Sequence, residues 1–281
     1  MSDYLMRSQG PLTDQEWQTL DRVVVQVARR NLVARRFLTI FGPVGAGVQS
    51  FAADTFRADR LAHASLFAAE EEDLIAVQAR TFVPLPILYH DFRLHWRDLE
   101  TARRFGAPLE TTGAAIAAAS VADLEDRVIL NGYGELQQQG FLSAEGRQRL
   151  PLGDWGSPGG AFATAVNASR ALSEAGFRGS YTLVAPPQLF AQLNRVFDNT
   201  AVLEIDQIRR LLTGEVYKSP TLPEGVAVVV AAGQENMDLL IAQDVATAFL
   251  EPEAMEHYLR VLEILALRIK RPGAICTLGQ V

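Results

Sequence analysis

The sequence predicts a protein of the α+β class, and two kinds of observation carry that prediction. Residues 14–32 have the apolar spacing of an amphipathic helix, and residues 112–130 have the alanine content of a long helix. Residues 261–278 form an apolar run of strand type that passes through an Arg-Pro-Gly-Ala turn, and shorter apolar runs at 181–185 and 226–230 also indicate strands. Helices and strands are therefore both expected in one chain.

The first helix is expected to begin near Asp14. Thr13 and Glu16 have the spacing of a capping box, in which the Thr side chain accepts a backbone N–H and the Glu side chain reaches back. Apolar residues then recur every three or four positions, at Trp17, Leu20, Val24, Val27, Ala28 and Leu32. One side of this helix is therefore apolar, and we expect it to pack against another part of the protein or against a partner.

Several further elements are expected along the chain. In order, they are a glycine-rich turn at 42–47, a projecting arm over 52–82 with an acidic run at 70–73, an extended edge strand over 84–94, a helix over 161–175 that ends at Gly176, a helix opened by Pro187, and two separate strands at 239–242 and 247–250. The helix over 112–130 is expected to stop at Asn131-Gly132.

Composition narrows the class of protein. The chain has 281 residues and is 48% hydrophobic, enough for one large domain or two closely joined ones. A formal charge of −7 argues against a protein that coats nucleic acid. Cys276 is the only cysteine, so no intrachain disulfide can form and a cytoplasmic setting is expected. Neither a signal peptide nor an apolar run of about 18 residues is present, so no membrane association is expected.

Motifs that would carry catalysis are weak. The glycine-rich run at 42–47 lacks the Gly-Lys-Ser/Thr ending of a phosphate-binding loop, and a turn is the better interpretation. His90 and His95 are badly spaced for one metal ion, on a helix or on a strand. No nucleophile elbow occurs, and Cys276 lies in an apolar strand end that favours an inert buried thiol.

The apolar side of the first helix has two interpretations. It can pack into the core, which composition alone favours. Alternatively, its short valine and alanine side chains, with Arg29, Arg30, Arg35 and Arg36 alongside, can form a shallow apolar groove with a charged rim that accepts an extended peptide.

Eight segments of the chain resemble the encapsulins, bacterial shell proteins that share the major capsid fold of tailed phages. The segments are 7–8 with 11–12 (Arg-Ser and Pro-Leu), 26–30 (Gln-Val-Ala-Arg-Arg), 42–49 (Gly-Pro-Val-Gly-Ala-Gly-Val-Gln), 95–100 (His-Trp-Arg-Asp-Leu-Glu), 151–160, 202–205, 235–239 (Glu-Asn-Met-Asp-Leu) and 267–270 (Leu-Arg-Ile-Lys). The resemblance covers essentially the whole chain, and it is strongest to family 1, the linocin-like group, of the myxobacterial encapsulin A type.

The resemblance implies a division of the chain into the parts of the capsid fold. Residues 1–51 would form an N-terminal lumenal helix and the start of the P-domain, 52–82 the E-loop, 83–152 the P-domain with its spine helix, 153–230 the A-domain, and 231–281 the return strands of the P-domain and the E-loop base. On this basis a lumenal helix stands where a phage capsid protein has its N-terminal arm.

The resemblance also implies a site that binds the targeting peptide of a cargo protein, and so favours the groove. Matched residue by residue, the helix wall of the groove is Val24, Val27, Ala28, Leu32 and Arg35, and the second wall is Asp244 and Val245. Relatives often have Asp where this chain has Thr39, so a salt bridge to a basic cargo tail is either missing or supplied by Asp244.

The expected function is a self-assembling icosahedral shell subunit and not an enzyme, with itself and a cargo protein as partners and no nucleic acid. A ferritin-like iron-oxidising cargo is favoured, for iron storage and protection from oxidative stress. The alternatives are a dye-decolorising-type haem peroxidase cargo, a phage or prophage major capsid protein and, weakest, a free-standing enzyme. No cofactor is expected in the shell chain, because iron is handled by the cargo and the register around Trp96 does not support flavin.

Overall fold

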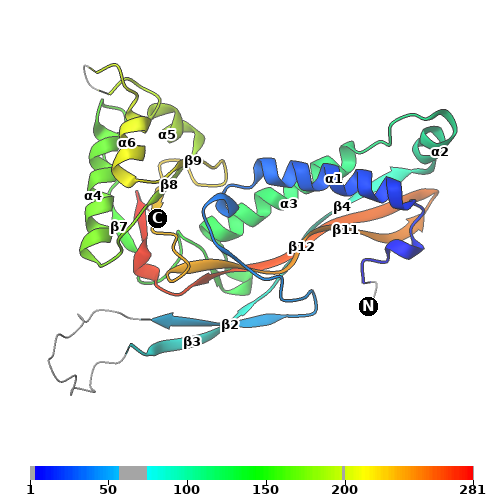
Figure 1. The fold of residues 1–281 in the computed structure, drawn as a ribbon, viewed down its shortest axis with the longest axis horizontal. Coiled ribbons are helices and arrows are strands. Elements are labelled where there is room, and N and C mark those ends of the chain that lie inside the picture. Colours follow the sequence, from blue (N-terminus) through cyan, green and yellow to red (C-terminus); the bar gives the residue numbers. More distant parts are fainter. Residues whose placement is uncertain (1–3, 57–74, 198–199, 281) are drawn as a thin grey trace.

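Two limbs meet at a concave corner in this protein, whose computed structural model describes residues 4–56, 75–197 and 200–280. The longer limb is a four-stranded sheet with two long helices on one face, and the shorter limb is a five-stranded sheet with shorter helices (Figure 1). A two-stranded hairpin extends along the underside of the shorter limb in the same view.

The sheet of the longer limb has the strand order β1-β11-β12-β4. Its strands are β1 (Ile40–Phe41), β4 (Ile87–His95), β11 (Met237–Glu253) and β12 (Glu256–Ile269). β1 runs parallel to β11, and the other pairs are antiparallel. β4 lies at an edge of the sheet, which confirms the position expected from the prolines that precede it.

β11 corrects one expectation. The sequence predicted two strands, at 239–242 and 247–250, where the structure has one strand of 17 residues. The register against β12 shifts between Ile241 and Gln243 and again between Gln243 and Ala246. These irregularities interrupt the apolar alternation, and for that reason the sequence alone indicated a break.

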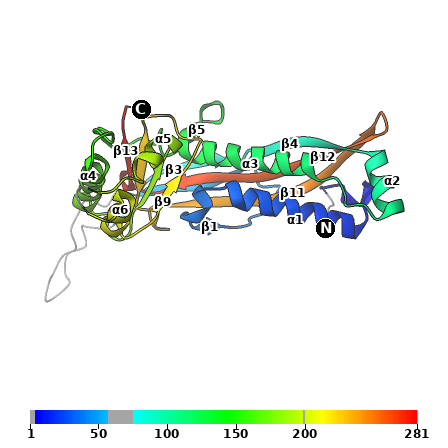
Figure 2. The same ribbon diagram turned by 90° about the horizontal axis from the view of Figure 1, so that it is seen from above.

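Two long helices lie side by side on one face of this sheet (Figures 1 and 2). They are α1 (Asp14–Asn31) and α3 (Thr112–Asn131). α1 buries Trp17, Leu20, Val24 and Ala28 at the expected spacing. α3 turns small residues toward the core, among them Ala114, Ala117 and Ala118, which lets neighbouring elements approach closely. The expected helix over 112–130 is confirmed.

The capping box at the start of α1 is present. Thr13 donates its backbone N–H to Glu16 Oε2 at 2.7 Å, and the Glu16 N–H reaches Thr13 Oγ1 at 3.3 Å. Thr13→Ala should lower the free energy of unfolding by about 1 kcal/mol, measured by chemical denaturation. Thr111→Ala is the matched control, because Thr111 precedes α3 without any side-chain capping bond and its loss should cost little. Equal losses for both variants would contradict the capping role.

The sheet of the shorter limb has the order β7-β13-β10-β8-β9. Its strands are β7 (Gln148–Leu150), β8 (Thr182–Ala185), β9 (Val216–Lys218), β10 (Ala227–Val230) and β13 (Ile275–Leu278), and its helices are α4 (Gly160–Glu174), α5 (Pro187–Gln192) and α6 (Glu204–Leu212). The expected A-domain at 153–230 does not contain the whole sheet. β7 and β13 lie outside those bounds, because the chain turns after β12 and brings β13 against β10.

The hairpin consists of β2 (Ser50–Phe56) and β3 (Val77–Pro84), paired antiparallel. These strands belong to the expected arm over 52–82, whose acidic run at 70–73 lies outside the described residues. The remaining elements are α2 (Trp96–Phe105), β5 (Gly132–Tyr133), β6 (Gln138–Gln139) and the short 3-10 turns η1 (Arg7–Gln9), η2 (Ala34–Arg36), η3 (Gly134–Leu136) and η4 (Pro272–Ala274).

The glycine-rich run at 42–47 is a turn packed on the sheet. Val44 and Gly45 donate their N–H groups to the carbonyl oxygens of Ile241 and Ala242, each at 3.0 Å. Gly42 has a φ of 129°, and a Cβ there would collide with the Ile241 carbonyl oxygen. The N–H groups of Val44 and Gly45, which a phosphate would need, are already used by β11, so the turn interpretation is confirmed.

Candidate functional site

The two walls expected for the peptide groove do meet in the fold. Ala28 and Leu32 form a small apolar cluster with Ala122 of α3, and Val245 of β11 packs against that cluster. Thr39 lies beside Leu239, to which it is hydrogen-bonded, five residues along β11 from Asp244. The end of α1 and the irregular part of β11 are therefore neighbours, and Thr39 sits further along the strand.

The expected groove residues differ in their exposure. Val24, Ala28 and Leu32 are 1%, 3% and 5% exposed, so in this subunit they belong to the core that composition alone favoured. Val27 and Val245 are half-buried, and Asp244 is exposed. We call Val27, Asp244 and Val245 the α1–β11 surface.

Arg35 is not part of an exposed rim, contrary to the expectation from the sequence. Its side chain is 13% exposed and donates to three carboxylates, at 2.8 Å to Glu125, 2.7 Å to Glu263 and 2.6 Å to Asp244. The N–H groups of Val33 and Ala34, at the start of η2, bond Asp126 of α3, and this contact holds Arg35 against that helix. The guanidinium thus ties together α3, β12 and β11.

Three of the acidic groups around η2 are buried. Glu125, Glu263 and Asp126 are 0%, 1% and 2% exposed. Together with Arg35 we call them the buried carboxylate cluster. The sequence analysis did not single out these three carboxylates. Glu263 stands between Leu262 and Ile264, whereas Glu125 and Asp126 stand in a charged run, residues 123–127, of an otherwise apolar helix. The apolar neighbours of Glu263 are the signal that could have indicated a buried carboxylate.

The charges of the cluster perturb one another. Burial raises the pKa of Asp126 to about 7, although its carboxylate accepts the N–H groups of Val33 and Ala34 at 2.8 Å each. Burial and the facing Glu125 charge raise the pKa of Glu263 well above its ordinary range. Burial alone would lower the pKa of Arg35, but its bonds to Glu125 and the neighbouring carboxylates raise that pKa. Arg35 therefore stays charged and holds the cluster together.

Asp244 connects the cluster to the surface. Its Oδ1 accepts from Arg35 Nη1 at 2.6 Å and from the Val245 N–H at 2.9 Å. The side chain is 62% exposed, so its carboxylate also faces solvent. The register shift of β11 at this point breaks the regular pairing and turns the acidic group outward.

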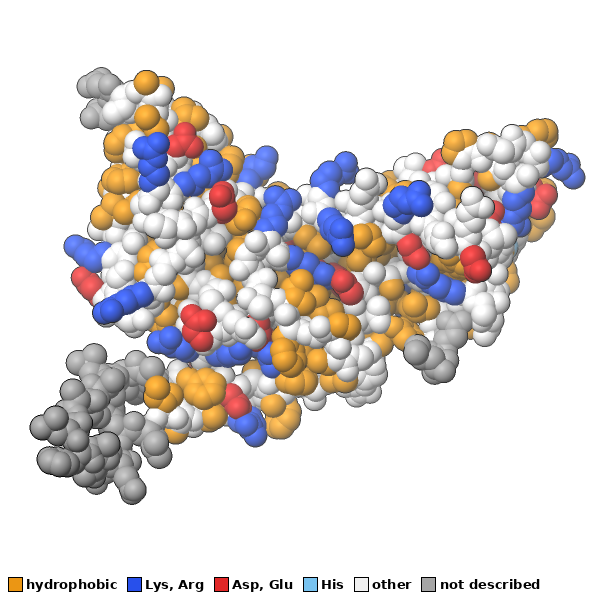
Figure 3. Space-filling view, viewed as in Figure 1, with side chains coloured by type: hydrophobic (Ala, Val, Ile, Leu, Met, Phe, Trp, Pro, Cys, Tyr) orange, Lys and Arg blue, Asp and Glu red, His pale blue; other side chains and the backbone are white. Residues whose placement is uncertain are grey.

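Basic residues surround this region. Figure 3 shows Lys and Arg side chains along the face that carries α1. Four exposed arginines belong to α1 and η2, namely Arg22, Arg29, Arg30 and Arg36. Of the four arginines expected on a charged rim, Arg29, Arg30 and Arg36 are exposed and Arg35 is largely buried.

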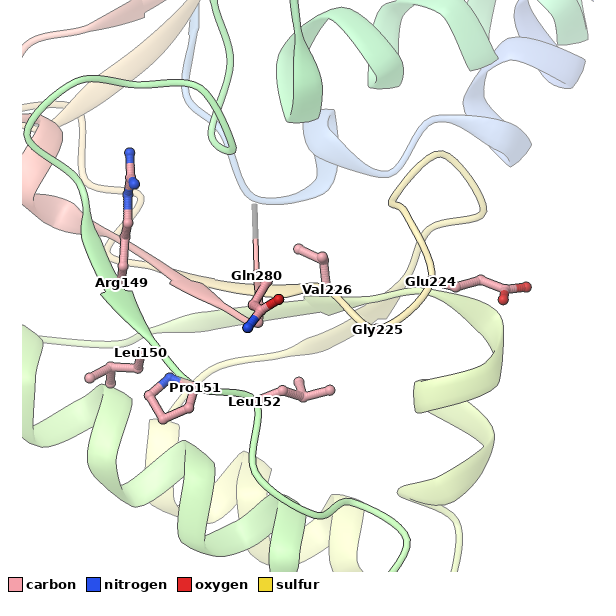
Figure 4. Close-up of a pocket in the computed structure, with 9 residues that line it drawn as sticks. Arg149, Leu150, Pro151, Leu152, Glu224, Gly225, Val226 and Gln280 are labelled. Carbon is pink, nitrogen blue, oxygen red and sulfur yellow. The ribbon is translucent and has the colours of Figure 1, made fainter.

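Two cavities among the described residues lie away from the α1–β11 surface. One, of about 670 Å³, is lined by residues 149–152, 224–226 and 279–280 of the shorter limb (Figure 4). The other, of about 940 Å³, lies between the base of the hairpin and residues 136–139, with Leu267 and Ile269 on its wall. Among the described residues, no group of three or more His, Cys, Asp and Glu is placed to hold a metal ion.

The residues weighed for chemistry have structural roles. His95 precedes α2, and its Nδ1 accepts the Arg97 N–H at 3.1 Å. Cys276 is fully buried, and burial raises the pKa of its thiol to about 11, so the expected inert buried thiol is confirmed.

Sequence comparison identifies the family. Residues 1–266 match the family described as "encapsulating protein for peroxidase". The chain is 46% identical to the type 1 encapsulin shell protein EncA of Myxococcus xanthus, over 99% of this chain and 97% of that protein. The chain belongs to the encapsulin shell-protein family.

Other encapsulins are more distant in sequence. A diheme-cytochrome–encapsulin shell fusion protein of Kuenenia stuttgartiensis is 36% identical over 95% of this chain and 73% of its own length. A ferritin-like–encapsulin shell fusion protein of Pyrococcus furiosus is 25% identical over 74% of this chain and 56% of its own length.

Solved structures confirm the expected fold of this encapsulin. A virus-like particle subunit from Pyrococcus furiosus has a TM-score of 0.78 at 20% identity, covering 95% of this chain and all of that one. The capsid protein of Myoviridae phage XM1 has a TM-score of 0.64 at 12% identity, covering 89% of this chain and 92% of that one. The encapsulin therefore has the major capsid fold of tailed phages, which phage proteins share.

Membership of this family answers the broad question of function. The encapsulin chain is a structural shell protein, and the prediction that it is not an enzyme is confirmed. No helix in the described part of the chain is long and apolar enough to cross a membrane.

Proposed function

We propose that this encapsulin subunit assembles with many copies of itself into a closed icosahedral shell in the cytoplasm, which encloses a cargo protein through a C-terminal targeting peptide. The observation that supports the proposal is the 46% identity with the EncA shell protein over nearly the full length of both chains. A closed shell makes many symmetric contacts at once, so each contact can be weak. The shell chain itself carries no cofactor in this proposal.

The proposed cargo is a ferritin-like protein that oxidises iron for storage and protection from oxidative stress. Support comes from the myxobacterial type of the sequence and from a relative in which a ferritin-like part is fused to the shell chain. A haem peroxidase is the second candidate, because the matching family is described as encapsulating peroxidase.

The α1–β11 surface is the proposed docking site for the targeting peptide. Val27 and Val245 offer apolar contact over a rigid cluster of buried side chains. Asp244 offers a carboxylate to a basic residue of the peptide, in the role that relatives give to an Asp where this chain has Thr39. An apolar patch beside one exposed charge suits a short peptide with aliphatic and basic residues.

Val27→Asp should leave shell assembly intact and reduce cargo loading by about tenfold or more, since docking would bury an unpaired charge. Particles would be counted by electron microscopy, and co-purified reporter protein carrying a tail of Gly, Leu and basic residues would be measured per shell. Gln26→Asp is the control, because it places the same charge on the exposed side of the same helix. Unchanged loading of the Val27→Asp shell would refute the docking site. Leu32 is unsuitable for this test because it is buried.

The two cargo candidates are separated by competition. Two reporters carrying the tails of a ferritin-like protein and of a peroxidase would be co-expressed with the shell in equal amounts. Preferential loading of the first supports iron cargo, and preferential loading of the second supports the alternative.

A further inference from the structure

Two buried carboxyl groups share the Arg35 guanidinium, which also bonds Asp244 of the α1–β11 surface. Glu125 on α3 and Glu263 on β12 accept from Nε and Nη2 of the same Arg35 guanidinium, which brings the two carboxyl groups close together. Arg35 Nη2 bonds Glu263 Oε2 at 2.7 Å, while the other oxygen of Glu263 is buried without a hydrogen-bond partner. Two carboxylates cannot bond each other unless one of them carries a proton.

The charges around the pair favour that proton. Glu125, Glu263 and Asp126 are buried. Arg35 pairs with Glu125 and Glu263, and Asp126 accepts the backbone N–H groups of Val33 and Ala34. A fully ionised cluster would hold three buried negative charges against one positive charge, a costly arrangement in a medium of low dielectric constant. One proton held by Glu125 and Glu263 together removes one of these buried charges.

We propose that Glu125 and Glu263 share one proton, and that this protonated pair is the positioning unit that holds Arg35, and through Arg35 holds Asp244, at the α1–β11 surface. The inference rests on the proposed docking site and names the groups that regulate it. When the proton is lost, the two carboxylates repel each other, Arg35 is drawn from its shared position, and Asp244 loses its partner.

The groups that face the pair come from every packed element. α3 contributes Asp126 beside Glu125, with Asp123 acting on Asp126 from a distance. η2 contributes Arg35, and β11 contributes Asp244, whose charge also acts on Glu263. β4 places the apolar Leu88 opposite Glu263 in the sheet. The negative charges of Asp126 and Asp244 therefore favour binding of the proton, and the positive charge of Arg35 opposes it.

Whether stability rises or falls with pH depends on which state, folded or unfolded, binds more protons. A carboxyl group whose folded-state pKa is raised binds more protons in the folded than in the unfolded state, so its stabilising effect is full below the unfolded pKa and is lost as pH rises through the folded pKa. For Asp126 that window runs from 3.8 to about 7. For Glu263 it begins at 4.5 and extends well above. Stability from both groups therefore falls as pH rises.

Glu263→Gln tests the pair because its amide cannot lose the proton that the carboxyl loses. The thermal unfolding midpoint of wild-type shells should fall from pH 6 to pH 9, and that of the variant should fall less, so that the two curves separate as pH rises. The fall that remains should end near pH 7, above which Asp126 is ionised in both the folded and the unfolded state. Parallel curves, or a variant equally destabilised at every pH, would overturn the proposal.

Three further variants make the test specific. Glu125→Gln should flatten the curve as Glu263→Gln does, because either amide can replace the shared proton. The double variant should be less stable than either single one at every pH, since Arg35 then keeps only the exposed Asp244. Asp91→Asn is the matched control on the same sheet, where Arg260 holds the pKa of Asp91 below its usual range, and its curve should parallel the wild type from pH 6 to pH 9. A flattened Asp91→Asn curve would overturn the assignment.

The link to docking is measured separately. Shells reassembled at each pH with a reporter carrying the basic tail should lose about tenfold in tail-dependent loading between pH 6 and pH 9, and Glu263→Gln shells less than about twofold. A tail-free reporter gives the background. If the tailed reporter loads no better than background in wild-type shells at pH 6, the proposed docking site has failed, and the thermal curves still decide whether the pair holds a proton.

Discussion

Replacing Arg35 with alanine is expected to abolish recovery of assembled shells. The change removes the cation that Glu125 and Glu263 bond and leaves buried carboxylates without compensation. Breaking a buried ion pair from one side costs about 3–5 kcal/mol, a large part of the 5–15 kcal/mol that separates folded from unfolded proteins. The yield of particles on size exclusion and the midpoint of chemical denaturation would measure the loss.

Arg36→Ala is the control for this prediction. Arg36 is exposed, donates to the Arg30 carbonyl oxygen at 3.0 Å and lies 6.0 Å from the Tyr217 ring centroid. Its removal should change stability by about 0.5 kcal/mol or less. Arg35→Lys should remain strongly destabilised, because one ammonium group cannot reproduce the fixed fork that meets three carboxylates. A stable Arg35→Ala shell would contradict the central place given to this residue.

The long elements of the fold were predictable because their signals are local. The capping box set the start of α1, alanine content set α3, and Pro187 set the start of α5. α2 and α6 were not predicted, although Ile205, Ile208 and Leu212 of α6 have helical spacing, because each helix is short and its periodic signal covers few turns. The continuity of β11 was missed for a related reason, because a register shift is a property of the paired strands and not of one strand.

The candidate site was predictable only in part. The sequence and the family resemblance together indicated that the end of α1 meets residues 244–245, and the structure brings them into contact. Burial is a tertiary property, so the sequence could not separate half-buried Val27 from buried Val24 on the same side of the helix. The role of Arg35 depends on Glu125 and Glu263, which lie about 90 and 228 residues away in the chain, and no local pattern reports such a meeting.

Asp238→Ala is expected to destabilise the subunit by about 3–5 kcal/mol as well, through the base of the hairpin. Asp238 is fully buried and accepts two bonds from Arg268, at 2.7 Å each, and one from Lys270 at 2.7 Å. Arg268 in turn lies over the rings of Phe41 and Phe51, at 4.3 and 5.2 Å from their centroids, so this one carboxylate fixes the contact of β12 with β1 and β2.

Because the loss falls where the hairpin joins the sheet, Asp238→Ala should expose Phe51 and the neighbouring β2 strand to protease before the rest of the subunit unfolds. Limited proteolysis with mass analysis of the fragments would show early cleavage there, and chemical denaturation would give the free energy. Asp91→Ala is the matched control, since Asp91 makes the same two-bond contact with Arg260 at a more exposed site, where such a pair contributes about 0–1 kcal/mol. Equal costs for the two variants would show that burial of the Asp238 pair does not set its contribution, and cleavage beginning elsewhere would show that the hairpin is anchored by other contacts.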